Sequence, residues 1–195
     1  MKNKGGSIMK YDLSKKPTRG AQRTLEAFSK TMLELLSQKS FEHISVNEIC
    51  DISNFPRATF YNYFDDKYDL VDYCWYTLAK EIQVDKVTKV ESDRALIVYF
   101  DRLYDIFDKN KHLLNNILQN NQFSGQLVNS FINYFKNTMQ KIFRKAIDYS
   151  KYDLPVELMA DHCSDTVLLV LEWIFLRQQT TTQEQAHKYL DTLLN

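Results

Sequence analysis

The residues with the clearest capacity for chemistry lie in one short stretch, from Ser45 to Lys67. Its second half combines guanidinium, hydroxyl and amide groups with two phenylalanines; the residues are Arg57, Thr59, Phe60, Tyr61, Asn62, Tyr63 and Phe64. When apolar positions lock two short helices together, the outward face of the second helix is left for a nucleic acid. The pattern predicts a helix-turn-helix whose second helix, from Arg57 to about Tyr63, enters the DNA major groove.

The elements that must position these side chains have recognisable start and stop signals. Ser45 and Glu48 form a capping box at the start of the first helix. Asn54 tolerates the left-handed conformation that a tight turn needs, and Pro56 suits the first position of the next helix. A preceding helix, from near Thr18 to about residue 38, has an apolar face on which the pair can pack.

The stretch also carries a family pattern. The string Thr59-Phe60-Tyr61-Asn62-Tyr63-Phe64, followed by Lys67 and Leu70, resembles the T-F-Y-x-Y/H-F-x-x-K-x-x-L pattern of the TetR/AcrR family of transcriptional regulators. The resemblance covers about residues 20–80. Asn54 and Pro56 depart from it, since the family commonly has glycine in the turn and serine as the cap. Loss of that cap costs about 1 kcal/mol, partly offset by the fixed backbone angle of proline.

The resemblance implies where DNA contacts would lie. Arg57, Ala58 and Tyr61 would face base edges, and the forked guanidinium of Arg57 matches the two acceptors of guanine. The remaining expected contacts are to phosphates, thymine methyl groups or the DNA backbone; they are made by Thr59, Asn62, Tyr63, Lys67, Ser45 and Asn47. Phe60 and Phe64 are assigned to the core.

Charge is distributed unevenly along the 195-residue chain, although 25 basic and 25 acidic residues leave no formal net charge. A neutral whole is not typical of a protein that binds nucleic acid over its entire surface. The first two dozen residues are basic, opposed only by Asp12; the cations are Lys2, Lys4, Lys10, Lys15, Lys16, Arg19 and Arg23. We therefore expect one DNA-facing end, with a solvated leader as the equally simple alternative before Lys15.

Composition favours an all-α chain, because only 4 glycines and 3 prolines interrupt many good helix formers. Beyond the motif, amphipathic patterns predict helices over residues 65–84, 92–108, 111–118, 126–149, 156–178 and 182–194. We expect three parts: a flexible basic leader over residues 1–17, a three-helix DNA-binding domain over 18–66, and a helical dimerisation and ligand-binding domain over 67–195.

The resemblance implies that the second domain holds a small-molecule pocket. The sequence itself shows only a surplus of aromatic residues, which ordinary core packing explains most simply. Converging rings with a few polar tips would instead line a pocket for an apolar or aromatic effector. The candidate lining residues are Tyr99, Phe100, Leu103, Tyr104, Phe107, Phe131, Tyr134 and Trp173.

The helix predicted over residues 156–178 is apolar nearly all round at its centre, so it must be buried on more than one side. Packing against its own domain and against a twin would satisfy this, with burial inside a monomer as the alternative. Together with the last helix it resembles the four-helix dimer interface of the family, and a two-fold dimer would read two half-sites. The expected interface residues are Leu168, Leu171, Glu172, Phe175, Tyr189, Leu190 and Leu193.

Other chemistries find little support. The 3 cysteines are widely spaced and the 4 histidines lack metal-ligand spacing, so no disulfide framework, metal site or cofactor is expected. The absence of a catalytic motif and of a glycine-rich phosphate loop argues against an enzyme. We expect a cytoplasmic protein, because no apolar run approaches a membrane span and no signal peptide is recognisable. The expected partners are double-stranded operator DNA, a second copy of the chain and a small effector.

The serious rival is a coactivator or protein-interaction module that keeps the fold but has lost specific DNA binding. The presence of Arg57, Tyr61, Tyr63 and Lys67 argues against it. Either tyrosine taken alone would more simply be an ordinary surface or core aromatic. The whole string at fixed spacing reverses that preference.

Overall fold

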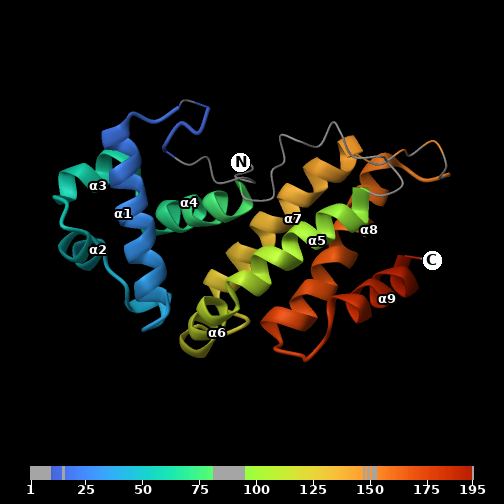
Figure 1. Ribbon diagram of the computed structural model, residues 1–195. Coiled ribbons are helices and arrows are strands. Elements are labelled where there is room, and N and C mark those ends of the chain that lie inside the picture. Colours follow the sequence, from blue (N-terminus) through green and yellow to red (C-terminus); the bar gives the residue numbers. More distant parts are fainter. Residues whose placement is uncertain are drawn as a thin grey trace, which may run out of the picture.

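The computed structural model describes residues 10–14, 16–80, 95–146, 148, 150 and 153–194. Every regular element within these ranges is helical, which confirms the all-α fold (Figure 1). The α-helices are α1 (Arg19–Leu36), α2 (Val46–Ser53), α3 (Arg57–Tyr63), α4 (Lys67–Lys80), α5 (Ala95–Lys109), α6 (Lys111–Asn120), α7 (Gln126–Ala146), α8 (Val156–Leu171) and α9 (Gln183–Leu194). A 3-10 turn spans Phe41–His43, and a π-helical turn spans Glu172–Leu176.

Helices α1, α2 and α3 form one end of the molecule (Figure 1). Thr18 caps α1, because its hydroxyl accepts a hydrogen bond from the Ala21 amide at 3.2 Å. The core of this end is built around the fully buried Phe28. The ring of Phe28 lies 5.3 Å from that of Phe60 and 6.2 Å from that of Phe64, which fixes α3 against α1.

Helix α4 joins the two ends of the molecule, since it packs against both α1 and α7. The other end contains α5 to α9, with α7 and α8 packed along each other (Figure 1). Its core is aromatic: the ring centroids of Phe131 and Phe135 lie 4.7 Å apart, and those of Phe107 and Phe175 lie 5.6 Å apart. Within the described ranges, no helix has the length and apolarity needed to span a bilayer.

The helix expected over 156–178 stops earlier than predicted. Helix α8 ends at Leu171, the chain continues as the π-helical turn, and Gln178 has a φ of 54°. A left-handed residue ends a helix, and this conformation at a non-glycine residue is not visible in the apolar pattern. The parts of the expected helices that fall on residues 81–94, 147 and 149 lie outside the described residues.

Candidate nucleic-acid interface

Helix α2 begins with the cap that the sequence predicts, but with only half of the capping box. The Ser45 hydroxyl accepts a hydrogen bond from the Glu48 amide at 3.2 Å. The Glu48 carboxylate forms an ion pair with Lys39 instead of turning back to Ser45. The start of α2 is therefore tied to the segment that follows α1, and Ser45 and Asn47 remain exposed there.

The turn between α2 and α3 has the conformation expected of Asn54, which has φ 58° and ψ 40°. Phe55 follows and packs its ring 5.4 Å from that of Phe28. Pro56 is not the first helical residue but the N-cap, with φ −61° and ψ 149°. It has no side-chain hydrogen bond to offer, so α3 begins without a side-chain cap.

The outward face of α3 carries the residues expected to meet base edges. Arg57, Ala58, Tyr61 and Asn62 are exposed, whereas Phe60 between them is buried. The Arg57 guanidinium donates a hydrogen bond to the Tyr61 hydroxyl at 3.3 Å and lies 5.7 Å from the centre of its ring. Because the two residues are one helical turn apart, each restricts the rotamers of the other and displays a donor fork with a hydroxyl.

Two of the residues expected to contact DNA are less exposed than the others. Thr59 is half-buried, and so is Tyr63, whose ring lies 5.8 Å from that of Tyr11 and 6.4 Å from that of Phe64. Tyr63 therefore packs along the domain instead of standing out from it. In a helix, a residue three positions after a buried one lies on the same face, so Tyr63 lies on the same side of α3 as the buried Phe60.

Lys67 differs most from the expectation of a phosphate contact. Its ammonium donates hydrogen bonds to the carbonyls of Phe41 at 2.8 Å, Glu42 at 3.1 Å and Ile44 at 2.9 Å. It also lies 4.6 Å from the centre of the Phe41 ring, and burial lowers the pKa of this lysine. An ammonium has three donors, and all three are used. Lys67 fixes the 3-10 turn to the start of α4, so its ammonium is already engaged where a DNA contact was expected.

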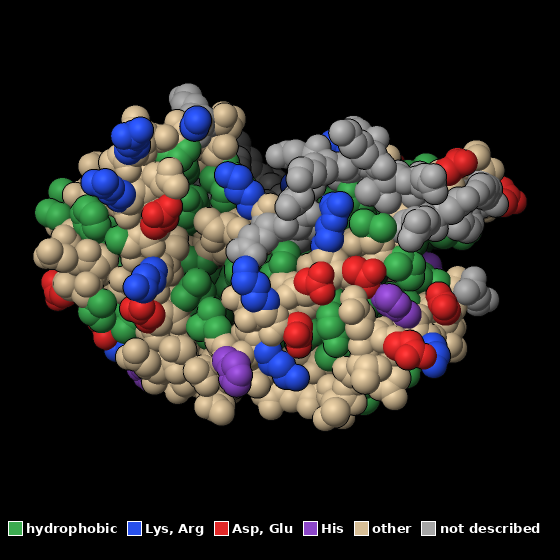
Figure 2. Space-filling model, viewed as in Figure 1, with side chains coloured by type: hydrophobic (Ala, Val, Ile, Leu, Met, Phe, Trp, Pro, Cys, Tyr) green, Lys and Arg blue, Asp and Glu red, His purple; other side chains and the backbone are tan. Residues whose placement is uncertain are grey.

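Basic side chains gather at this end of the molecule. In the view of Figure 2, several Lys and Arg side chains lie over the end formed by α1 to α3, with acidic ones among them. Arg19 and Arg23 are exposed in the first turns of α1. A local basic surface on a neutral chain is enough to attract a phosphate backbone.

Residues 30–74 match the family model of the bacterial regulatory proteins of the tetR family. This segment of the chain is therefore similar to the tetR family of regulators. The matched residues run from α1 through α2 and α3 to the middle of α4, so they contain the whole helix-turn-helix. The search of curated proteins found no match to the chain.

Solved structures share the fold of this chain over most of its length. A structure assigned to the TetR-family transcriptional regulators, from Syntrophomonas wolfei, has 20% identity and a TM-score of 0.64, over 89% of this chain and 94% of that one. The dihydroxyacetone kinase operon activator DhaS has 18% identity and a TM-score of 0.55, over 88% and 92%. A structure named as a transcriptional regulator from Pseudomonas aeruginosa has 14% identity and a TM-score of 0.58, over 91% and 90%. At these identities the likeness is one of fold.

Within the part of the chain that the structure describes, the residues expected to line a ligand pocket differ in their surroundings. Tyr99, Phe100 and Leu103 are fully buried in the core, whereas Trp173 is 44% exposed. The Tyr104 hydroxyl donates a hydrogen bond to the Thr181 carbonyl at 3.4 Å, which fixes this side chain. Ordinary core packing therefore explains the buried rings, and the indole of Trp173 lies partly in solvent.

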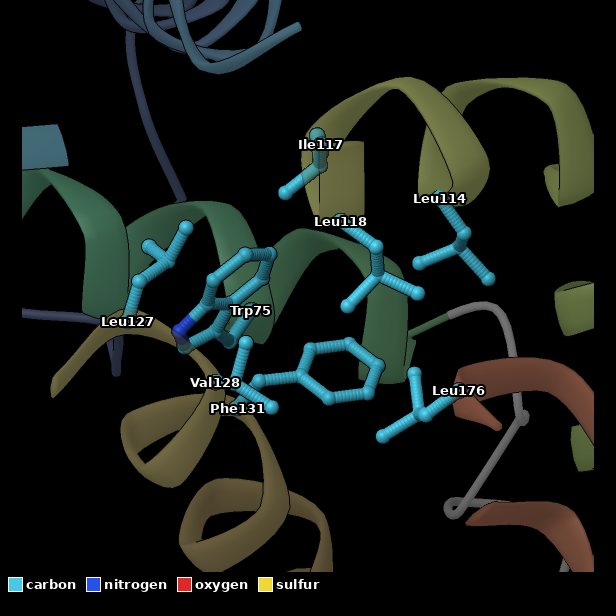
Figure 3. A pocket seen from close by; sticks show the side chains of 8 residues that line it. All are labelled: Trp75, Leu114, Ile117, Leu118, Leu127, Val128, Phe131 and Leu176. Carbon is cyan, nitrogen blue, oxygen red and sulfur yellow. The ribbon is translucent and has the colours of Figure 1, made fainter. Parts of the chain in front are cut away.

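Cavities do occur beside two of the expected residues. Phe131 lines a cavity of about 20 Å³ between α4, α6 and α7, whose walls are entirely apolar (Figure 3). The lining residues are Trp75, Leu114, Ile117, Leu118, Leu127, Val128, Phe131 and Leu176. Phe107 and Phe131 both line a second cavity of about 10 Å³. Tyr134 lies in neither, and burial raises the pKa of its phenol to about 12.

A larger groove lies at a place that the pattern of aromatic residues did not predict. An open groove of about 450 Å³ runs between α1, α4 and α6, with Leu33, Tyr73, Thr77 and Leu113 among its lining residues. Three helices that are not consecutive in the sequence form its walls. Such a groove depends on tertiary packing and cannot be recognised from the residues of any one helix alone.

The residues expected at a dimer interface divide into two groups. Leu168, Leu171, Phe175 and Leu190 are buried within the chain itself, and their assignment to an interface was wrong. Helix α8 packs against α5, α7 and α9, so its most apolar face is already covered. The accessible members of the expected set are Tyr189, Leu193 and, in part, Glu172.

Large apolar side chains are also exposed on another side of α8 and in the turn that follows it. Leu158 and Leu169 of α8 are 53% and 47% exposed, and Trp173 of the π-helical turn is 44% exposed. The spacing of eleven residues places Leu158 and Leu169 on one side of the helix, with the exposed His162 and Asp165 between them. The sequence pattern missed this face, because the same helix is apolar on the buried side as well.

Proposed function

We propose that the chain is a sequence-specific DNA-binding transcriptional regulator of the cytoplasm. The observation that carries the proposal is the outward face of α3, where Arg57 is held against Tyr61 on a TetR-type domain. The guanidinium fork suits the O6 and N7 acceptors of guanine in the major groove. Ala58 leaves room beside it for a close approach, and Asn62 adds an amide on the same exposed surface.

We infer that two copies bind one operator. A twin would cover the exposed apolar side chains of α8, of the π-helical turn and of α9, namely Leu158, Leu169, Trp173, Tyr189 and Leu193. A two-fold dimer would hold its two recognition helices for half-sites about one turn of DNA apart, roughly 34–36 Å. One helix of seven residues offers few base contacts, so the second half-site supplies the missing affinity.

We further propose repression that a small apolar or aromatic ligand relieves. The apolar cavity beside Trp75 and Phe131 is far smaller than the roughly 300–1,000 Å³ of a typical ligand site, so a ligand would have to enlarge it. Its walls come from α4, α6 and α7 (Figure 3), and α4 leads directly from the DNA-binding end. Displacement of α4 would change the spacing of the two recognition helices.

A selection experiment tests DNA binding. Duplexes are selected from a random library by the full-length protein, and the best is compared with a scrambled duplex in a shift assay. Arg57→Ala should reduce the preference for the selected duplex by about 1–3 kcal/mol, and Arg57→Lys should restore part of it. If a well-folded wild-type dimer selects no duplex at low salt, the rival reading as a protein-interaction module replaces this proposal.

The sign of regulation needs its own test, because one structural neighbour is named as an operon activator. A reporter placed behind the selected duplex should be repressed by the protein and released by its deletion. Lower expression after deletion would contradict repression. For the ligand, small aromatic compounds such as indole should raise the melting temperature of the wild type but not of Leu118→Trp, which fills the cavity.

A further inference from the structure

The first described residues of the chain fold back onto the end of the recognition helix. The Lys10 ammonium donates a hydrogen bond to the Tyr61 carbonyl at 2.5 Å and lies 3.2 Å from the Asp65 carboxylate. The ring of Tyr11 packs 5.8 Å from that of Tyr63 and 6.0 Å from that of Tyr73. Residues about fifty positions apart thus meet at the C-terminal end of α3.

Helix α3 has little support of its own. It has seven residues, no side-chain N-cap, no acidic residue in its first turn and no basic residue in its last turn. Isolated helices of this length are unstable in water, and their last carbonyls lack intrahelical partners. The Tyr61 carbonyl is one of those, and the cation that reaches it comes from outside the helix.

We propose that Lys10 and Tyr11 form a clasp that positions the recognition helix for DNA binding. Both are positioning residues, and the inference rests on the proposed function as a DNA-binding regulator. The clasp provides at the C-terminal end of α3 the support that Pro56 does not provide at its N-terminal end. With α3 held, Arg57 and Tyr61 are presented in one orientation, which lowers the entropy lost on binding.

Asp69 joins the clasp to the turn between α3 and α4. One of its carboxylate oxygens accepts hydrogen bonds from the Lys10 amide at 3.2 Å and from the Asp65 amide at 3.0 Å. Asp69 is 7% exposed, so these bonds are shielded from water. The Asp69 carboxylate therefore holds the segment at Lys10 and the turn after the recognition helix in a fixed position relative to each other.

The ion pair alone does not explain the clasp. The side chains of Lys10 and Asp65 are 39% and 71% exposed, and such pairs contribute little. The capped carbonyl, the shielded bonds to Asp69 and the packing of Tyr11 carry the effect. Because the Lys10 ammonium already has a carbonyl and a carboxylate as partners, we assign it to positioning and not to a phosphate contact.

The test compares variants of the full-length protein on the selected and the scrambled duplex over a range of salt concentrations. Lys10→Ala and Tyr11→Ala should bind the selected duplex about two- to tenfold more weakly, with an unchanged salt slope. Lys10→Arg and Tyr11→Phe should retain most of the affinity. Lys16→Ala, which removes an exposed lysine from the segment before α1, is the matched control for charge.

Hydrogen exchange supplies a readout that needs no DNA. In Lys10→Ala and Tyr11→Ala the amides from Phe60 to Phe64 should exchange faster than in the wild type, while those of α1 stay protected. A salt slope lowered by about one in Lys10→Ala would overturn the proposal in favour of a phosphate contact. Unchanged affinity and unchanged exchange would overturn it as well. If the wild type selects no duplex, the proposed function fails, but exchange still tests the clasp.

Discussion

Asn121 joins the C-terminal helices to the turn that precedes the helix-turn-helix. Its side-chain oxygen accepts a hydrogen bond from the Phe41 amide at 2.8 Å, and its side-chain nitrogen donates to the Leu36 carbonyl at 3.2 Å and the Ile117 carbonyl at 2.9 Å. Asn121 is 4% exposed. One buried amide thus satisfies backbone groups on both sides of the junction.

We expect Asn121→Ala to lower the free energy of unfolding by about 2–3 kcal/mol, because it leaves buried backbone groups without partners. Urea unfolding measures the change. Asn116→Ala, at an exposed position of α6, should change the free energy by less than about 0.5 kcal/mol. Equal effects of the two substitutions would show that the junction does not depend on this amide.

Lys67→Ala should destabilise the protein without removing a phosphate contact. Three carbonyls lose their donor, so we expect the free energy of unfolding to fall by about 1–2 kcal/mol. The salt slope of binding to the selected duplex should stay unchanged. Lys30→Ala, at an exposed lysine of α1, is the control for the loss of a charge. A salt slope lowered by about one in Lys67→Ala would instead show that Lys67 contacts a phosphate.

Asp69 gives the stability a pH dependence whose sign is fixed by burial. Burial raises the pKa of this carboxyl above its ordinary value of 3.8, and the amides of Asp65 and Lys10 oppose the shift. The folded protein therefore binds this proton more readily than the unfolded chain. Its contribution to stability increases as the pH falls from neutral through the raised pKa, and levels off below the ordinary value.

The measurement is the difference in free energy of unfolding between the wild type and Asp69→Asn, from urea titrations at several pH values between 7 and 4. Asp69→Asn cannot titrate, so the difference should move in favour of the wild type as the pH falls. A movement in the opposite direction would mean that the hydrogen bonds outweigh burial and lower the pKa of Asp69.

Leu169→Arg should convert the proposed dimer into a monomer, because it replaces one of the exposed apolar side chains of the proposed interface by a charge. Sedimentation measures the mass, and affinity for a two-half-site duplex should fall by roughly a hundredfold. Asn133→Arg adds the same charge on the exposed face of α7 and should remain dimeric. A dimer that survives Leu169→Arg would exclude this face as the interface.

The helix-turn-helix was predictable because its signals are local. Ser45 caps α2, Asn54 adopts the left-handed turn, and Phe60 is buried one residue before the exposed Tyr61. Each follows from a single residue or a short period. Lys67 was misplaced because its three acceptors come from a turn more than twenty residues earlier, and a spacing rule cannot supply those partners.

The C-terminal half was less predictable for a related reason. Apolar residues on α8 include Leu168 and Leu171, which are buried, and Leu169, which is exposed. Hydrophobicity alone cannot separate them when a helix is apolar on several faces. The neighbours of the helix decide which face stays open, and here α5, α7 and α9 cover the others.

The sequence by itself determined the helical class, the position of the recognition helix and the residues on its outward face, since caps, turns and helical period act over a few residues. Only the tertiary structure decided that Lys67 holds a turn, that Lys10 and Tyr11 reach the end of α3, and that Leu169 lies outward. Those outcomes depend on contacts between distant segments, which form only when the chain closes around its core.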